Sequence, residues 1–521
     1  MRKATWLIAL SALIWVVVGI YGVIFNISYI DEAKYLIKGW LMTTGQVSYY
    51  KTPEFFYQHM PGVFLWYGLG QKIFGPSLLV GRLQSFLVGL IVYYSSFVLG
   101  KRLAGYKGGV VTLLLLSLSS VAALDYSAAV PQSLVVLTLI IGFVCLYDGL
   151  VKGNEPRFFW ASFWFSLAFI VRENFLFTLI LYAGLLVFVF RDKFKLFLKH
   201  LTVILMTLGV FIIPGYPGTV AVLKNFPGVS RFLPVSQAEK QVLALYWKEG
   251  LQTPGLHFRA VREFGVIFHA WAVIWFLIIF DWLRKPKKTP ARFTPRQLFW
   301  WFLVGATVFN FIIHSWAAFK LSPRAIISYF SYVSPLVAVI MAGIITPKLK
   351  NLKFERLALG VYLGLLALVP VGPRFARIFA IPTRNPDLVK IVNSASKLEP
   401  LIEGKENIVW IDEPISLYLA ERVSYYPLIH HTGFYKSSND TEIVRNLGFW
   451  NQTMLNGWLK EADLVVVGAN KLKLLKEVPE GRSLASFIEA KLNEDFELIE
   501  ERVDIWPGKM VFYEPKTLEL E

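Results

Sequence analysis

Acidic side chains are scarce in the first 373 residues of this 521-residue chain, which contain 35 Lys and Arg but only 13 Asp and Glu. Two of these acids, Asp31 and Glu32, follow directly on an apolar run that ends near Ile24. If that run spans a membrane, the pair lies at its edge, where a partly dehydrated carboxylate is a more effective base. Proton abstraction is therefore one candidate role, and a solvated pair that starts a helix is the other.

A third acid, Asp125, ends another apolar run, in the sequence Leu-Asp-Tyr-Ser. A carboxylate at that depth needs a partner, unless it caps the following helix. Asp31 and Asp125 are also the candidate ligands for a divalent metal. The single cysteine, Cys145, lies inside an apolar run, so neither a disulfide framework nor a cysteine-based metal site can form within the chain.

The elements that position these residues are mostly membrane helices. Hydrophobic residues make up 55% of the chain and charged residues 17%, with a mean hydropathy of +0.52. A helix needs about 20 apolar residues to cross the hydrocarbon core. This rule predicts about eleven spans, centred near residues 15, 90, 117, 141, 165, 182, 211, 274, 306, 335 and 364. No small-residue cleavage site follows the first, so we expect it to be a retained span.

Basic residues gather between the spans, near residues 2–3, 101–107, 152–157, 191–199, 284–296 and 348–356. The positive-inside rule places these clusters in the cytoplasm, which explains the basic pI without nucleic acid as a partner. An odd number of spans then places residues 374–521 outside. That parity requires residues 172–174 to separate two helices and not to interrupt a single one.

Cations at the outer ends of spans are the second group of candidates. The positive-inside rule predicts few basic residues at these outer ends, yet the sequence places Arg172, Lys320 and Arg324 there. They need an anionic partner, such as a phosphate or Glu173, or else they snorkel to lipid headgroups. His59 is a candidate donor near the headgroups, or a histidine with only a structural hydrogen bond.

The last part of the chain predicts a small α/β domain. Short β-branched or aromatic runs at 408–411, 464–467 and 509–513 alternate with helical patterns at 415–422 and 484–492. No phosphate-binding glycine motif accompanies them, so nucleotide binding is not expected. We therefore expect a membrane domain over residues 1–373 and a soluble domain over 374–521. Residues 62–79 are expected to lie along the membrane surface, and 215–265 to form a flap over a site.

The order of residues between 31 and 105 resembles the GT-C membrane glycosyltransferases, in particular the branch of protein O-mannosyltransferases and lipid A aminoarabinose transferases. The pattern consists of D-E-x-x-Y at Asp31, Glu32 and Tyr35, Gly45, H-x-P at His59 and Pro61, Phe74-Gly75, Arg82, and Gly100 to Gly105. The spans and the α/β tail extend the likeness over most of the chain.

This resemblance implies an inverting transfer of a sugar from a polyprenyl-phosphate donor to an acceptor hydroxyl at the extracytoplasmic face, with Asp31 as the base. It implies that His59 lies close to the lipid phosphate, and that no cofactor or catalytic metal is needed. Arg172, Arg324 and Lys320 are further candidates for contact with this phosphate, because fixed cations in a poorly hydrated site stabilise the negative charge that gathers on it. The sequence departs from the family pattern at two places. Ala325 replaces the aromatic residue of P-R-Y, and Gln132 stands where an acid often follows the proline. These departures bear on the identity of the sugar and the acceptor.

Two other classes stay open at this stage. A lipid or sugar transporter would also have many spans, although transporters usually place ionisable groups at mid-bilayer and broken helices in matching halves. A membrane scaffold would need neither Asp31 nor the outer cations. The acceptor could be a protein, a lipid-linked glycan or a cell-wall polymer. We expect the chain to be a multi-pass protein of a prokaryotic plasma membrane, in contact with membrane lipids.

Overall fold

The computed structural model describes residues 5–26, 28, 30–47, 59–214, 216–224, 233–242, 294–321, 330–349, 360, 387–429, 435–477 and 479–516. The chain forms two compact units, each built from several stretches of sequence. Unit 1 comprises Met1–Val23, Leu83–Phe211 and Gly250–Arg384, and unit 2 comprises Ile24–Arg82, Ile212–Glu249 and Asn385–Glu521. The predicted domain boundary at residue 373 lies outside the described residues and stays a prediction.

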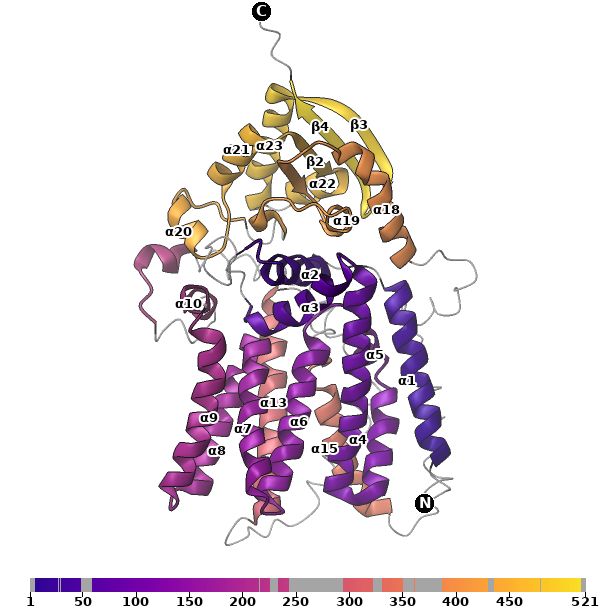
Figure 1. Cartoon of the computed structure of the whole chain (residues 1–521), viewed down its shortest axis with the longest axis vertical. Coiled ribbons are helices and arrows are strands. Elements are labelled where there is room, and N and C mark those ends of the chain that lie inside the picture. The colour runs from indigo at the N-terminus through magenta and orange to yellow at the C-terminus, as the bar shows by residue number, and fades with distance from the viewer. Residues whose placement is uncertain are drawn as a thin grey trace, which may run out of the picture. The chain divides into compact units, whose positions relative to one another are not determined.

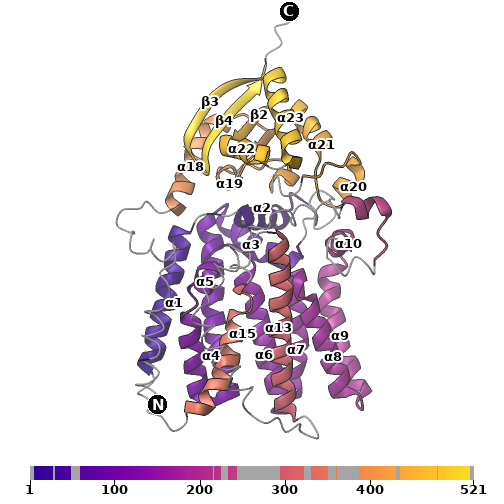
Figure 2. The same ribbon diagram turned by 180° about the vertical axis from the view of Figure 1, so that it is seen from behind.

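Unit 1 is helical, because its sequence consists of long apolar runs. Figures 1 and 2 show its helices as roughly upright rods lying side by side. They are α1 (Thr5–Phe25), α4 (Leu78–Ser117), α5 (Ser120–Asp125), α6 (Gln132–Leu150), α7 (Glu155–Val171), α8 (Leu176–Phe190), α9 (Phe194–Ile212), α13 (Pro295–Leu321) and α15 (Ser334–Ile345), with the short 3-10 helices η3 (Glu173–Phe175) and η5 (Thr346–Leu349). α13 packs against both α6 and α8.

Six helices among the described residues are long and apolar enough to cross a membrane. They are Thr5–Phe25, Leu78–Ser117, Gln132–Leu150, Glu173–Phe190, Phe194–Ile212 and Pro295–His314. α7 has 17 residues and α15 has 12, and the centres expected near 274 and 364 lie outside the described residues. A membrane-spanning helical fold is thus confirmed, while the number eleven stays a prediction.

Two details of the predicted spans can be checked directly. Arg172 has an extended backbone and ends α7, so the stretch around it separates two helices, as the predicted topology requires. α4 contains non-helical residues at Ala104 and Gly105, and Gly105 has φ +72°, a conformation that favours glycine. This break separates the spans expected near 90 and 117. α9 ends at Ile212, so its centre lies several residues before the expected 211.

Unit 2 joins two short amphipathic helices to the α/β domain. The two are α2 (Ile30–Thr43) and α3 (Pro61–Phe74), which pack against each other. Both have 14 residues, too few to span a membrane, which fits the expectation that residues 62–79 do not cross it. A further helix, α10, covers Tyr216–Lys224. Residues 225–232 and 243–265 of the predicted flap lie outside the described part of the chain.

The α/β domain contains a four-stranded sheet in the order β1-β2-β4-β3. β1 (Ile408–Ile411) and β2 (Leu464–Gly468) are parallel and fully buried, and β4 (Gly508–Pro515) is antiparallel to β2. All three strands were predicted. β3 (Phe496–Ile505) was missed, because its many charged residues suit the solvent-facing edge of a sheet and hide the apolar alternation.

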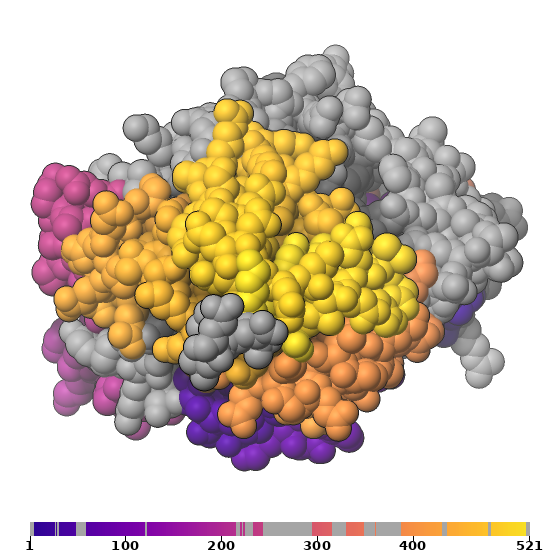
Figure 3. Space-filling view, turned by 90° about the horizontal axis from the view of Figure 1, so that it is seen from above, coloured from indigo at the N-terminus to yellow at the C-terminus, as the bar shows by residue number. Residues whose placement is uncertain are grey.

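Helices accompany the sheet of this domain. They are α18 (Asp387–Ile402), α19 (Ile415–Leu419), α20 (Thr441–Asn446), α21 (Gln452–Glu461), α22 (Ala469–Glu477) and α23 (Pro479–Asp495). Figure 3 shows α18 beside the β3–β4 hairpin on one face. α19 and α23 correspond to the two predicted helical patterns, and Val409, Ile411, Val465 and Val467 form the centre of one apolar core.

Candidate active site

The first turn of α2 carries Asp31, which is the strongest candidate base from the sequence. Its carboxylate accepts a hydrogen bond of 2.7 Å from the ammonium of Lys34, one helical turn later. The Asp31 side chain is 50% exposed, whereas that of Lys34 is only 4% exposed. A buried cation therefore orients a carboxylate that solvent, and so a substrate, can reach.

Lys34 also connects Asp31 to His59, the residue that lies just before Pro61 and the start of α3. Lys34 Nζ lies 3.2 Å from Nε2 of His59. An ammonium has donors only, so a charged Lys34 requires Nε2 to accept and the imidazole to be neutral, with its proton on Nδ1. In this geometry His59 holds Lys34 in place, and the positive charge belongs to the lysine.

Aromatic rings pack on one side of the Lys34–His59 pair. The Tyr35 ring lies 5.7 Å from that of His59, 5.7 Å from Phe64 and 6.4 Å from Tyr67. Lys34 Nζ lies 4.8 Å from the centre of the Tyr35 ring, which adds a cation–π contact. The rings reduce the access of water to Lys34 and hold α2 and α3 together.

A second buried lysine follows one turn after Lys34. Lys38 is 0% exposed, and its ammonium lies 5.5 Å from the centre of the Phe64 ring. Burial, and then the neighbouring positive charge of Lys34, lower the pKa of Lys38 well below its ordinary value of 10.5. Neither lysine is among the residues predicted from the sequence, although the i, i+4 spacing of Lys34 and Lys38 just after Asp31 would have placed both on one face of a short helix.

The second predicted acid, Glu32, has a different environment. Its two oxygens accept hydrogen bonds from Nε and Nη2 of Arg82, at 3.0 and 2.8 Å, and both side chains are fully buried. Nη2 of Arg82 also donates to the backbone carbonyl of Asn26 at 3.0 Å. Glu32 therefore fixes the start of α2 to the segments before and after it, and its oxygens are occupied by the guanidinium.

α2 and α3 approach each other closely at two glycines. A Cβ on Gly68 would collide with the backbone carbonyl of Gly39, so only glycine fits there. The hydroxyl of Thr43 donates to the Gly68 carbonyl at 2.9 Å. This close packing fixes the distance between Asp31 on α2 and His59 at the start of α3.

The α/β domain contributes a buried acid to the surroundings of α2. Glu413 follows the end of β1 and is 7% exposed. Burial raises its pKa well above the ordinary value of 4.5, and nearby negative charges raise it further. These charges belong to Asp412, Glu32 and Asp31. Glu413 therefore lies close enough to the first turn of α2 to be affected by the charges of Asp31 and Glu32.

Unit 1 buries two of the predicted site residues, Asp125 and Arg172. Arg172 Nε lies 3.6 Å from Glu173, the residue that was one of its two predicted anionic partners. Both interact electrostatically with His314, whose ring lies 4.8 Å from that of Tyr332. Asp125 is 7% exposed, and the next residue, Tyr126, donates to the Ser331 carbonyl at 2.6 Å.

The structure thus brings Asp31 and His59 together through Lys34 in unit 2, and it places Asp125 and Arg172 in unit 1. The side chain of Lys320 and all of Arg324 lie outside the described residues. In the described part of the chain, no group of three or more His, Cys, Asp or Glu side chains is arranged to hold a metal ion. The roles assigned to these residues, and the absence of a metal requirement, stay predictions.

The sequence and the fold of this chain are both similar to those of known proteins. Residues 58–215 match the family model described as dolichyl-phosphate-mannose-protein mannosyltransferase. The fold also matches the crystal structure of ArnT from Cupriavidus metallidurans bound to undecaprenyl phosphate, with a TM-score of 0.52 and 13% identity over 98% of this chain and 97% of that chain. The chain has the GT-C fold of membrane glycosyltransferases. The resemblance that the D-E-x-x-Y and H-x-P elements predicted is confirmed at this level.

The structure of the same ArnT in the apo state matches with a TM-score of 0.40 and 13% identity over 98% of this chain and 97% of that chain. No curated protein matches the sequence. The matched segment 58–215 contains His59, Asp125 and Arg172, and Asp31 lies before it.

Proposed function

We propose that this GT-C protein transfers a sugar from a polyprenyl-phosphate donor to an acceptor hydroxyl, by a single inverting displacement with Asp31 as the base. The observation that carries this proposal is a half-exposed carboxylate held by a buried ammonium, which in turn contacts a histidine. The fold match supports the choice of donor, because the matching structure of ArnT is bound to undecaprenyl phosphate.

In the proposed step, the acceptor oxygen attacks the anomeric carbon while the bond from that carbon to the phosphate oxygen breaks. The bonding electron pair leaves with the phosphate, and Asp31 takes the proton of the acceptor hydroxyl. The products are an inverted glycoside and the polyprenyl phosphate. Asp31 suits this role because it is both exposed and oriented, whereas both oxygens of Glu32 are engaged by Arg82.

Negative charge gathers on the phosphate as it leaves, so fixed cations in a poorly hydrated site lower the barrier. Lys34 is a buried cation of this kind, since its ammonium pairs with the carboxylate of Asp31. Burial and the charge of Lys34 lower the pKa of Lys38, one turn later, so we assign the fixed positive charge to Lys34. We propose that Lys34 contacts the donor phosphate, with His59 holding it in place. Arg172, Lys320 and Arg324 are proposed as further phosphate contacts, on the basis of the sequence.

We place the reaction at the extracytoplasmic face of the membrane, because the basic clusters favour a cytoplasmic location for the opposite ends of the spans. The sugar is activated by its phosphate ester, so the proposed reaction needs no nucleotide. The acceptor is a glycan, a lipid or a protein with a free hydroxyl.

The test is to incubate the full-length protein in nanodiscs with a panel of polyprenyl-phosphate sugars and with glycan, lipid and peptide acceptors, and to follow the lipid phosphate by mass spectrometry. We expect release of the lipid phosphate with at least one donor, loss of that release in Asp31→Asn, and normal release in Asp192→Asn, which changes an exposed acid. Movement of an intact donor across a vesicle membrane without cleavage would favour a transporter and contradict the proposal.

A further inference from the structure

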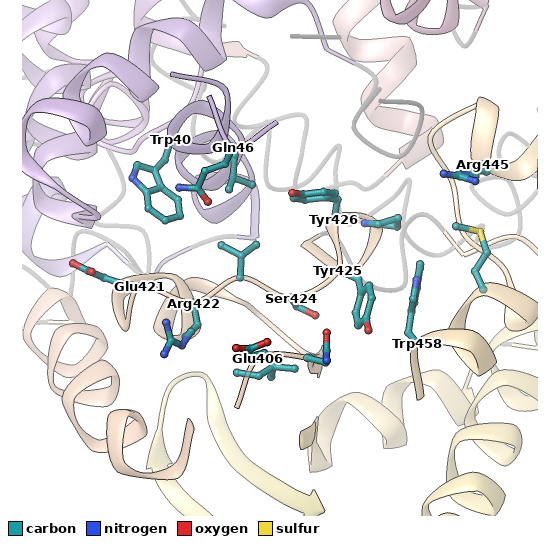
Figure 4. A pocket seen from close by; sticks show the side chains of 16 residues that line it. Trp40, Gln46, Glu406, Glu421, Arg422, Ser424, Tyr425, Tyr426, Arg445 and Trp458 are labelled. Carbon is teal, nitrogen blue, oxygen red and sulfur yellow. The ribbon is translucent and has the colours of Figure 1, made fainter. Parts of the chain in front are cut away.

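Unit 2 contains a cavity of about 570 Å³, a volume typical of small-ligand sites. It is lined by the end of α2 and Gln46 beyond it, by residues 406–408 at the start of β1, by residues 421–427 after α19, and by α20 and α21. Figure 4 shows Trp40 and Gln46 on one side of it and Tyr425, Tyr426 and Trp458 on another. These residues are far apart in the sequence, so folding alone brings them to one hollow.

The lining combines flat aromatic rings with planar polar groups. Four aromatic side chains contribute, and Tyr425 stacks on Trp458 with ring centres 5.1 Å apart and an interplanar angle of 21°. Such a stack is rigid and presents a flat apolar surface at little entropic cost. The lining also contains the amide groups of Gln46 and Asn407 and the guanidinium of Arg445, which are hydrogen-bonding groups for a ligand. A ligand with flat apolar faces and many hydroxyl groups at its edges fits this combination.

The charges of the lining restrict the ligand further. Its ionisable side chains are two acids, Glu406 and Glu421, and two bases, Arg422 and Arg445, so their formal charges cancel. A site for a nucleic acid or a phosphate would instead carry an excess of positive charge. The ligand that these features favour is a neutral oligosaccharide.

This cavity is separate from the reacting centre. Trp40 follows Asp31 by nine residues on α2, which is about 13 Å along the helix axis and about half a turn round it. A sugar in the cavity therefore cannot also present its hydroxyl to Asp31. The cavity suits the part of a glycan that lies several sugars away from the hydroxyl that reacts.

We infer that this cavity is a subsite for the distal sugars of a glycan acceptor, so that the acceptor is an oligosaccharide chain. This inference names the acceptor class of the proposed transferase and rests on that function. Binding in the cavity, however, needs no catalysis and can be measured separately.

The first test measures binding of neutral mannose and glucose tetrasaccharides to the full-length protein in nanodiscs, by saturation-transfer NMR and calorimetry. We expect at least one to bind, and about tenfold weaker binding in Tyr426→Ala and in Arg445→Gln, since each removes one contact from the ligand. Matched controls are Phe487→Ala, which removes an aromatic ring that packs on the same core as Tyr425 and Trp458 but lies outside the cavity lining, and Arg482→Gln, an exposed arginine elsewhere. Binding of none of the sugars, or equal binding by all variants, would overturn the inference.

The second test uses transfer to acceptors of different length. If the inference holds, Tyr426→Ala and Arg445→Gln raise the acceptor KM about tenfold for a tetrasaccharide and leave it unchanged for a monosaccharide. The donor KM stays the same. Equal effects on short and long acceptors would overturn the subsite. Saccharide binding without any sugar transfer would instead contradict the proposed function and leave the cavity as a glycan-binding site.

Discussion

The ion pair between Glu32 and Arg82 allows a test of the roles we assign to the two acids in the first turn of α2. Asp31 is the proposed base, and Glu32 is a positioning residue. Both side chains are fully buried, and the carboxylate accepts two hydrogen bonds from the guanidinium. Glu32→Gln leaves the arginine charge buried and uncompensated, which costs about 3–5 kcal/mol. For a folding unit of this size 1 kcal/mol shifts the Tm by about 2–4 °C, so we expect a decrease of roughly 6 °C or more.

A double variant distinguishes the effect on Tm of removing both partners of the ion pair from the effect of removing only one. Glu32→Leu combined with Arg82→Met replaces two buried charges by apolar groups, and we expect it to melt closer to the wild-type protein than either single variant. Glu494→Gln, which removes an exposed partner of Lys491, is the control and should change the Tm little.

The assay is thermal unfolding of the full chain in nanodiscs, together with transfer measured well below the Tm. Glu32→Gln should retain transfer at low temperature, because we assign Glu32 a positioning role. A wild-type Tm for Glu32→Gln would refute the argument from burial. Complete loss of transfer in a folded Glu32→Gln protein would assign the acid to the reaction instead.

Three further predictions concern other parts of the site. Lys34→Met removes the cation between the base and the histidine, so transfer should fall about 100-fold or more, with partial recovery in Lys34→Arg, as measured by lipid phosphate release. Gly68→Ala forces α2 and α3 apart and should lower both the Tm and the transfer rate, whereas Gly184→Ala, where an added Cβ meets nothing within 4 Å, should change neither. The raised pKa of Glu413 means that the folded protein holds this proton more tightly, so stability falls as the pH rises from about 4.5 through the raised value. In unfolding experiments across this pH range, the stability of Glu413→Gln should no longer fall as the pH rises. The same pH dependence of stability in Glu413→Gln and in the wild-type protein would contradict this prediction.

The sequence predicts the class of fold well, because the apolar runs of the helices and the β-branched runs of the strands are local features. Long apolar runs predict membrane helices, and the run Ile-Val-Trp-Ile predicts β1 at its observed bounds. The proline of H-x-P begins α3 as its missing N–H allows. β3 was missed because Glu497, Glu500 and Arg502 suit an exposed edge strand and also suit a helix or a loop.

The candidate site was predicted only in part. Asp31 and His59 could be found because each has an unusual place in the sequence, but what joins them is Lys34, an ordinary lysine in a short charged segment. Its burial depends on the contact between α2 and α3, which no local pattern shows. The cavity was missed for the same reason, since Trp40 and Trp458 meet only through the fold.

The most direct test of the central claim is single-turnover transfer by Asp31→Asn with a saturating polyprenyl-phosphate sugar. The amide keeps the shape of the side chain and cannot accept the proton as a carboxylate does, so we expect the donor to bind with near-normal affinity and the rate to fall about 10²–10⁴-fold. Asp192→Asn provides the matched control. Transfer by Asp31→Asn at the wild-type rate would contradict the account.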